Sequence, residues 1–558
     1  IIVKRGTMSI ILGILLLINF SYGLSADESE LVVETALGSV EGSYRKSSLG
    51  YKYRAFEGIP YGKPPIDDLR FEPPERYGPW EGTLMAKRPR SGCVQFAPET
   101  VNLPERVHGD EDCLHLNIYT PSNLPKNQLN LLPVLFWIYG GSFQFGEGSN
   151  EGSSYIMNRN LIFVTFNYRL NILGFMSTGD GVVPGNMGLK DQSLALRWIH
   201  ENIESFGGDP NGITLGGVSA GGSSTHFHYL SPMSRGLFQG GMSFSGTALD
   251  NWAQTEGSGE KARKVGSLMG CPTENTKEMV DCLKKKPAKK IAAQVGNFQP
   301  FMFNPDVPFG PVVEQNSSSP FLDRTPVEII RSGDAADLPW ISTVVSEEGL
   351  FPVAEFIEKK EILEELDEKW VEIAPHLLDF NFTVPQDEQA SVAETIRHHY
   401  FGGNKIDKKS VMSLVYLHGH RSFSPLGARL MAKYNRSPVW VYYYNYRAQI
   451  SLTDLFNVTG NYGVCHSDDV LLFIIKSELA EITDEPTLKM QKILLDMIKS
   501  FMLNGKPSVG VSWPPVKPAK KNLRYLHISG PEDLRAKVTS NFAQEKFWSS
   551  ISFDENRI

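Results

Sequence analysis

The sequence has no apolar run beyond residue 26 that is long enough to cross a membrane. Spanning a bilayer as a helix takes about 18 to 20 consecutive apolar residues, and no later segment reaches that length. We therefore expect a protein without a membrane span.

Positive charge is also scarce, because 55 Lys and Arg residues face 63 Asp and Glu residues and the formal net charge is −8. This balance argues against nucleic acid as a partner. The sequence contains no Cys/His cluster with metal-ligand spacing and no Walker or dinucleotide glycine motif. We therefore predict neither a metal nor an organic cofactor.

Linkers are absent as well. The 558 residues would suggest about three or four domains from length alone. However, no Ser/Gly/Pro-rich stretch, low-complexity tract or repeat interrupts the chain. We interpret residues 27–558 as one large α/β domain with long insertions.

The N-terminal residues resemble a secretory signal. Residues 1–7 precede the first methionine, Met8, and are interpreted as translated upstream sequence. Residues 8–26 combine a short apolar segment with small residues up to Ala26, which predicts a signal peptide and secretion. Four Asn-X-Ser/Thr sequons fit this route, at Asn316, Asn381, Asn435 and Asn457. Pro438 follows the third sequon closely and makes its use doubtful.

Only five cysteines are present. Outside the cell, the local pairs Cys93–Cys113 and Cys271–Cys282 would close short surface loops. Four half-cystines allow three connectivities, and the sequence alone leaves these open. Cys465 remains over, and we interpret it as a small buried residue rather than a nucleophile.

The segment Phe206–Gly221 (FGGDPNGITLGGVSAG) is the most informative part of the chain. It reads as a turn, a short strand over Ile213–Gly217, and a G-x-S-x-G elbow around Ser219. Glycines on either side of the serine lack Cβ atoms, so a strand and a helix can close on a strained turn that exposes the hydroxyl. The segment predicts that Ser219 is a nucleophile.

Two further segments could complete a serine hydrolase site. Leu132–Ile138 reads as a buried strand that ends in a glycine pair, where backbone N–H groups can approach a substrate oxygen. Leu338–Val345 reads as another strand and delivers Glu347 and Glu348 at its end, where a triad acid belongs.

The base must follow the acid in the chain. His466 does so, in a glycine-containing loop after the expected strand Val439–Tyr446. His418, His420 and His527 also follow the acid, but their patterns are typical of surface or packing residues.

These motifs resemble the type-B carboxylesterase and cholinesterase family. Phe206–Gly221 fits its serine pattern, and Glu111–Tyr119 fits a second pattern except at His115. The similarity extends from about Val33 to Phe547 and is greatest to insect carboxylesterases, including those related to aphid and juvenile hormone esterases. The resemblance implies an α/β-hydrolase fold, with a large and mostly parallel sheet flanked by helices.

Carried over residue by residue, the resemblance makes Ser219 the nucleophile, His466 the base and Glu348 the residue that orients His466. Backbone N–H groups of Gly141, Ser142 and Ala220 become the oxyanion hole. The implied activity is hydrolysis of uncharged carboxylic esters through an acyl-enzyme, without a cofactor.

Three alternatives stay open. One is an esterase that degrades juvenile hormone, an odorant or a pheromone. A choline esterase is disfavoured, because the family's choline-binding tryptophan has no counterpart in Val94–Asp112. A non-catalytic adhesion protein of the same fold is disfavoured, because all three triad candidates are present. The oligomeric state is not indicated.

Overall fold

A computed structural model describes residues 30–98, 105–122, 131–354, 356–456, 458, 460–476, 478–518 and 522–553. Residues 1–7, the expected signal peptide 8–26 and the sequon residue Asn457 lie outside this part of the chain. Within it, no helix is both long and apolar enough to span a membrane. The same residues contain no group of three or more His, Cys, Asp or Glu side chains suited to a metal ion.

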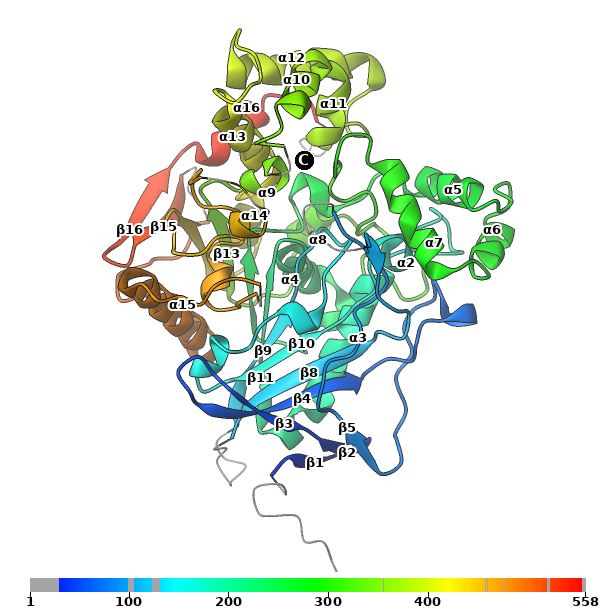
Figure 1. Ribbon diagram of the computed structural model, residues 1–558, viewed down its shortest axis with the longest axis vertical. Coiled ribbons are helices and arrows are strands. Elements are labelled where there is room, and N and C mark those ends of the chain that lie inside the picture. The colour runs from blue at the N-terminus through cyan, green and yellow to red at the C-terminus, as the bar shows by residue number, and fades with distance from the viewer. Residues whose placement is uncertain are drawn as a thin grey trace, which may run out of the picture.

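A large mixed sheet forms the centre of the molecule (Figure 1). Its eleven strands in the described residues follow the order β16-β15-β14-β13-β12-β11-β9-β10-β8-β4-β3. The seven strands from β15 to β10 in this order run parallel, and antiparallel strands flank them at both edges. The strands are β3 (Ser43–Lys46), β4 (Lys52–Pro60), β8 (His115–Pro121), β9 (Leu132–Ile138), β10 (Ile162–Phe166), β11 (Gly208–Val218), β12 (Gly240–Phe244), β13 (Trp340–Val345), β14 (Val439–Tyr444), β15 (Leu523–Gly530) and β16 (Asp533–Thr539).

Short strands outside the main sheet form two small sheets. The first contains β1 (Val32–Thr35), β2 (Gly38–Glu41) and β5 (Thr83–Met85), and the second contains β6 (Gln95–Phe96) and β7 (Val107–His108).

The central strands are apolar because both faces of the sheet are covered. In β9, Val134 and Phe136 belong to the hydrophobic cluster on one face. Leu135 and Trp137 belong to the cluster on the other. Successive side chains of a strand point to opposite faces, so a strand buried on both sides reads as a continuous hydrophobic run.

Helices cover both faces of this sheet (Figure 1). The cluster that holds Val134 also contains side chains of α3, α4, α8 and α14. The opposite cluster contains the apolar face of α15. The helices are α2 (Asn171–Phe175), α3 (Met187–Asn202), α4 (Ala220–Leu230), α5 (Ser258–Leu268), α6 (Thr276–Leu283), α7 (Ala288–Ala292), α8 (Pro326–Ser332), α14 (Leu426–Tyr434) and α15 (Glu485–Asn504).

A group of helices forms a further layer at the top of Figure 1. It has its own hydrophobic cluster, which includes Leu363, Trp370, Ile396 and Leu414. These helices are α9 (Leu350–Val353), α10 (Lys360–Glu368), α11 (Trp370–Leu377), α12 (Gln386–Phe401), α13 (Val411–Ser422) and α16 (Glu545–Trp548). Gly349, just beyond β13, packs directly on the α13 backbone, so this layer adjoins the end of β13.

The strand predictions differ from the structure mainly at their ends. Leu132–Ile138 is a strand with the predicted bounds. The strand before Ser219 is longer than predicted, starting at Gly208 with an irregular register before Ile213. The third strand begins at Trp340 rather than Leu338, after Pro339, which has no N–H to donate to a neighbouring strand. The fourth ends at Tyr444 rather than Tyr446.

The cysteine and sequon predictions fall on described residues with one exception, Asn457. The structure contains the disulfides Cys93–Cys113 and Cys271–Cys282, one of the three pairings left open, and Cys465 is a buried thiol. Asn316 is exposed and Asn381 is half-buried. Asn435 donates from Nδ2 to the Ala336 carbonyl at 3.1 Å, and a glycan on that nitrogen would disturb this contact.

Candidate active site

Ser219 lies on a sharp turn between β11, which ends at Val218, and α4, which begins at Ala220. Its backbone angles are φ 59° and ψ −124°, a sparsely populated region that costs on the order of 1–3 kcal/mol. Two backbone hydrogen bonds hold the turn: Ser219 N–H donates to the Phe244 carbonyl at 2.8 Å, and Ser223 N–H donates to the Ser219 carbonyl at 2.9 Å. The strained serine is therefore fixed from both the sheet and the helix.

The two glycines of the elbow are required by space. A Cβ on Gly217 would overlap the backbone of Gly221, and one on Gly221 would overlap the Ile138 carbonyl at the end of β9. Neither glycine has a positive φ. The G-x-S-x-G spacing thus lets α4 start in direct backbone contact with two strands, which places Ser219 at the C-terminal end of the central strand β11.

The predicted oxyanion donors lie next to this turn. Gly141 and Ser142 follow β9 with φ of 115° and 54°, and Ala220 is the first residue of α4. None of their three N–H groups donates a hydrogen bond to another residue in the described chain. Because unpaired N–H groups are rare in protein interiors, three together indicate donors available to an oxygen of a bound ligand.

Gln144 holds this loop and was missed by sequence reasoning. Its fully buried amide donates from Nε2 to the Ser142 carbonyl at 2.9 Å and to the Phe309 carbonyl at 2.6 Å. Pinning the Ser142 carbonyl fixes the Ser142–Phe143 peptide plane, directly after the two predicted donors of this loop. A single glutamine after a glycine turn carries no signal of this role, because Phe309 is far away in the sequence.

Glu348 and His466 form a buried hydrogen-bonded pair. His466 Nδ1 lies 2.6 Å from Glu348 Oε2, and the two residues are 3% and 2% exposed. The second carboxylate oxygen, Oε1, accepts from Val345 N–H at 2.8 Å. Rings of Phe351 and Phe423 pack on the imidazole, with centroid distances of 5.5 and 5.0 Å. This environment fixes the ring and leaves Nε2 to act on another group.

Ser219, Ser142 and His466 line one small cavity. Its volume is about 20 Å³, room for about one water molecule. The remaining lining residues are Trp252, Asp306, Val307, Phe351, Pro352, His418, Ser422 and Phe423. Glu348 is absent from this wall and reaches His466 from behind. The structure thus brings the predicted nucleophile, base and one oxyanion donor to one narrow space, whose wall includes Trp252, Phe351 and Phe423.

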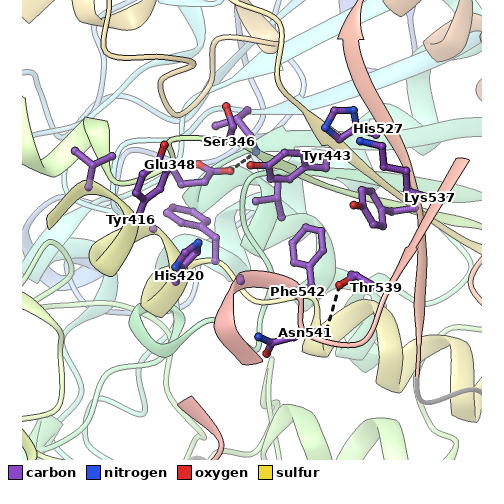
Figure 2. A pocket seen from close by; sticks show the side chains of 17 residues that line it. Ser346, Glu348, Tyr416, His420, Tyr443, His527, Lys537, Thr539, Asn541 and Phe542 are labelled. Atoms are coloured by element: carbon purple, nitrogen blue, oxygen red, sulfur yellow. Dashed lines mark hydrogen bonds between the residues drawn. The ribbon is translucent and has the colours of Figure 1, made fainter. Parts of the chain in front are cut away.

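A second cavity of about 270 Å³ lies on the other side of Glu348 (Figure 2). Tyr443, Phe542 and Lys537 stand around it, and Tyr416 and His420 of α13 close one side. Phe423 lines both cavities, so its ring separates this space from the one at Ser219.

His418, for which the sequence indicates a surface or packing role, is buried rather than at the surface. It is 4% exposed and forms part of the wall of the Ser219 cavity. Burial lowers its pKa to about 3, with a further contribution from nearby His466. The imidazole is therefore neutral at physiological pH.

Buried carboxyl groups surround the histidine loop. Asp468 accepts from Cys465 N–H, Leu452 N–H and Ser451 Oγ, each at 2.8 Å. Tyr442 donates its hydroxyl to Asp469 at 2.5 Å. Burial raises the pKa of Asp468 to about 7 and that of Asp469 to about 6. The loop is thus held by groups whose charge depends on pH.

Comparisons with known proteins identify the family of this chain. The model of the carboxylesterase family matches residues 29–548. The chain is 46% identical to venom carboxylesterase-6 of Apis mellifera over 551 residues, covering 98% of each chain. It is 34% identical to juvenile hormone esterase of Tribolium castaneum over 565 residues, covering 95% of each.

A solved structure is similar over nearly its whole length. Juvenile hormone esterase from Manduca sexta, with OTFP covalently attached, superposes with a TM-score of 0.82 at 28% identity. The match covers 93% of this chain and 99% of that one. The predicted α/β-hydrolase fold is confirmed.

Proposed function

The chain belongs to the carboxylesterase family and is a carboxylic ester hydrolase, and we propose that it is a secreted serine esterase acting on uncharged esters. Ser219, His466 and Glu348 form its triad, and Gly141, Ser142 and Ala220 supply the oxyanion hole. The observation that carries this proposal is the shared cavity of Ser219, Ser142 and His466, with Glu348 bonded to the far nitrogen of the imidazole.

The first half of the reaction makes an acyl-enzyme. Ser219 Oγ forms a bond to the ester carbonyl carbon while His466 Nε2 takes the hydroxyl proton. Charge develops on the carbonyl oxygen, where each N–H donor of the hole stabilises it by roughly 3 kcal/mol. His466 then protonates the alcohol oxygen as its bond to carbon breaks.

The second half repeats these steps with water. His466 takes a proton from water, the hydroxide oxygen bonds to the acyl carbon, and Ser219 leaves with the proton returned by His466. Glu348 accepts a hydrogen bond from Nδ1 throughout, which fixes the tautomer and stabilises the imidazolium. Every group needed for both halves belongs to the chain itself.

The cavity wall supports an uncharged substrate. Trp252, Phe351, Pro352 and Phe423 present mostly apolar surface. Asp306 also lines this wall, and acetylcholine is therefore included among the test substrates beside its neutral isostere. Relatives named juvenile hormone esterase make that hormone a second candidate.

We propose residues 27–558 as a single secreted domain, with 8–26 as signal peptide. Two disulfides support an oxidising compartment. Glycans are proposed at Asn316, Asn381 and Asn457, whereas the Asn435 contact disfavours one there. Expression with the signal and mass spectrometry of the medium test this assignment.

The decisive experiment is organophosphate labelling with peptide mapping, alongside hydrolysis of p-nitrophenyl esters of graded acyl length. We expect the label on Ser219 and no labelling or turnover in Ser219→Ala. Ser223→Ala is the matched control, because Ser223 is a buried serine of α4 whose hydroxyl has no partner in the described chain. Label on another residue, or a few per cent of activity in Ser219→Ala, would refute the assignment.

A further inference from the structure

Glu347, the neighbour of the triad acid, binds the backbone of the histidine loop. Its carboxylate Oε2 accepts from Val464 N–H at 2.8 Å. Its own N–H donates to the Val464 carbonyl at 3.1 Å. Val464 lies two residues before His466, so the end of β13 and the histidine loop are joined by both the backbone and the side chain of one residue.

The next residue of the loop is held by a second carboxyl group. Cys465 N–H donates to Asp468 Oδ2 at 2.8 Å, while Leu452 N–H donates to Oδ1 of the same carboxyl group. The three consecutive residues 464, 465 and 466 are therefore each bound by a different carboxyl group, the third being Glu348. Hydrogen bonds to charged acceptors are roughly twice as strong as neutral ones.

The surroundings of Glu347 orient its carboxylate toward Val464. Ser346 donates its hydroxyl to Oε2, and Tyr416 of α13 donates to Oε1 at 3.4 Å. Gly463 approaches the carboxylate so closely that a Cβ there would overlap it. The close contact with a glycine and the two hydroxyl donors indicate that the carboxylate of Glu347 is held in one position.

We propose that Glu347 is a positioning residue for ester hydrolysis: through Val464 it fixes the position of the His466 imidazole relative to Ser219. This inference rests on the proposed function. Glu348 restrains only the ring of His466, at Nδ1. Without the side-chain bond, Val464 is held only by the backbone bond from Glu347 N–H, so the loop can shift together with the ring, and a displacement of about 1 Å costs up to about 100-fold in rate.

The test compares Glu347→Ala, Glu347→Gln and a matched control, Glu328→Ala. Glu328 also accepts from a backbone N–H and a hydroxyl, both of Thr325, but at the start of α8. We expect Glu347→Ala to lose about 10- to 100-fold in kcat, with KM within about twofold. Glu347→Gln keeps an acceptor oxygen for Val464 N–H and should recover most of the loss. Glu328→Ala should lower the Tm without changing kcat.

A pair of glycine variants tests the same contact without altering Glu347. Gly463→Ala displaces the carboxylate, whereas Gly460→Ala imposes a similar backbone strain in the same loop with no contact closer than 3.7 Å. Their φ angles are 115° and 110°. We expect kcat to fall in the first variant only. This pair decides the matter if Glu347→Ala fails to fold.

Three results would overturn the inference: wild-type kcat in Glu347→Ala, an equal loss in Glu347→Gln and Glu347→Ala, or equal losses in the two glycine variants. His466→Ala separates this failure from that of the proposed function. If His466→Ala is inactive while Glu347→Ala is normal, only the inference is wrong. If His466→Ala keeps its activity, the triad itself is wrong.

Discussion

The two halves of the active site are fixed by different physical means. On the Ser219 side, position is set by backbone: glycines without room for a Cβ, and a turn bonded to β12. On the His466 side, position is set by side chains, because three carboxyl groups hold residues 464–466. The first kind of restraint involves no titratable group, whereas the second includes Asp468, whose pKa is raised by burial to about 7.

This difference assigns different vulnerabilities to the two halves. A steric change at the elbow should disable it at every pH. The histidine side includes Asp468 and Asp469, whose pKa values are raised by burial. Nearby Asp250 has its pKa raised by burial to about 8. We therefore expect the pH dependence of stability near the site to originate in the histidine half.

The largest loss of kcat is expected from a change on the His466 side, where side chains fix the position of the base. Glu348→Gln should reduce kcat by about 10⁴-fold, by analogy with the Asp-to-Asn change in a serine protease triad. An amide at this position fails to hold the required tautomer of His466. The measurement is steady-state hydrolysis of p-nitrophenyl acetate, with Glu328→Gln as a remote control. A greater loss in Glu347→Gln than in Glu348→Gln would transfer the acid's role to Glu347.

A somewhat smaller loss is expected on the backbone half. Gly141→Ala places a Cβ against the Phe145 carbonyl and should distort the oxyanion hole, at a cost of about 100- to 1000-fold in kcat. Gly179→Ala is the control, because it shares a positive φ but has its nearest neighbour at 3.6 Å. If Gly141→Ala keeps more than a tenth of the wild-type kcat, the hole is formed by other groups.

The sequence predicts the backbone half better than the side-chain half, for a physical reason. Ser219 and its glycines lie within a few residues of each other, so local steric requirements appear as a motif. Leu132–Ile138 was predicted with its observed bounds because a doubly buried strand is apolar throughout. Strand ends at Leu338 and Tyr446 were wrong, because they depend on pairing with distant strands.

Contacts between residues that are far apart in the sequence produce no recognisable sequence motif. Gln144 binds Phe309 across 165 residues, and Glu347 binds Val464 across 117. His418 was interpreted as a surface or packing residue, since a helical pattern does not reveal that one face borders a cavity. Such roles depend on the tertiary fold and are apparent only in the three-dimensional structure.

A moderate, pH-dependent effect on the free energy of unfolding is expected from Asp468→Asn. Because the native pKa of Asp468 is raised to about 7, the native state keeps a proton that the unfolded chain releases near pH 4. The resulting stabilisation is complete below pH 4 and is lost as pH rises to about 7. Relative to Asp468→Asn, the wild type should lose on the order of 2 kcal/mol between pH 5 and 8.

Thermal unfolding of both proteins at several pH values measures this difference. Asp209→Asn serves as the control, because Asp209 lies at the start of β11 and its carboxylate accepts a hydrogen bond from Asn211 N–H, and its offset from the wild type should stay constant with pH. A difference between wild type and Asp468→Asn that is flat, or that grows with pH, would mean that Asp468 is already ionised in the folded state.

The smallest effect is expected from Cys465→Ser. This variant tests the role of the side chain at this position separately from that of its backbone N–H. Its N–H is bound by Asp468, but its side chain is fully buried in the helical layer. Burial raises the pKa of the thiol well above its usual value, so little reactive thiolate exists. Cys465→Ser leaves the N–H in place, and activity should stay within a few-fold of wild type while stability falls by about 1 kcal/mol for the buried hydroxyl.

Iodoacetamide followed by mass spectrometry should label Cys465 only after denaturation. Labelling of the native protein, or a loss of kcat comparable to that of Glu347→Ala, would show that the side chain at 465 also positions the base.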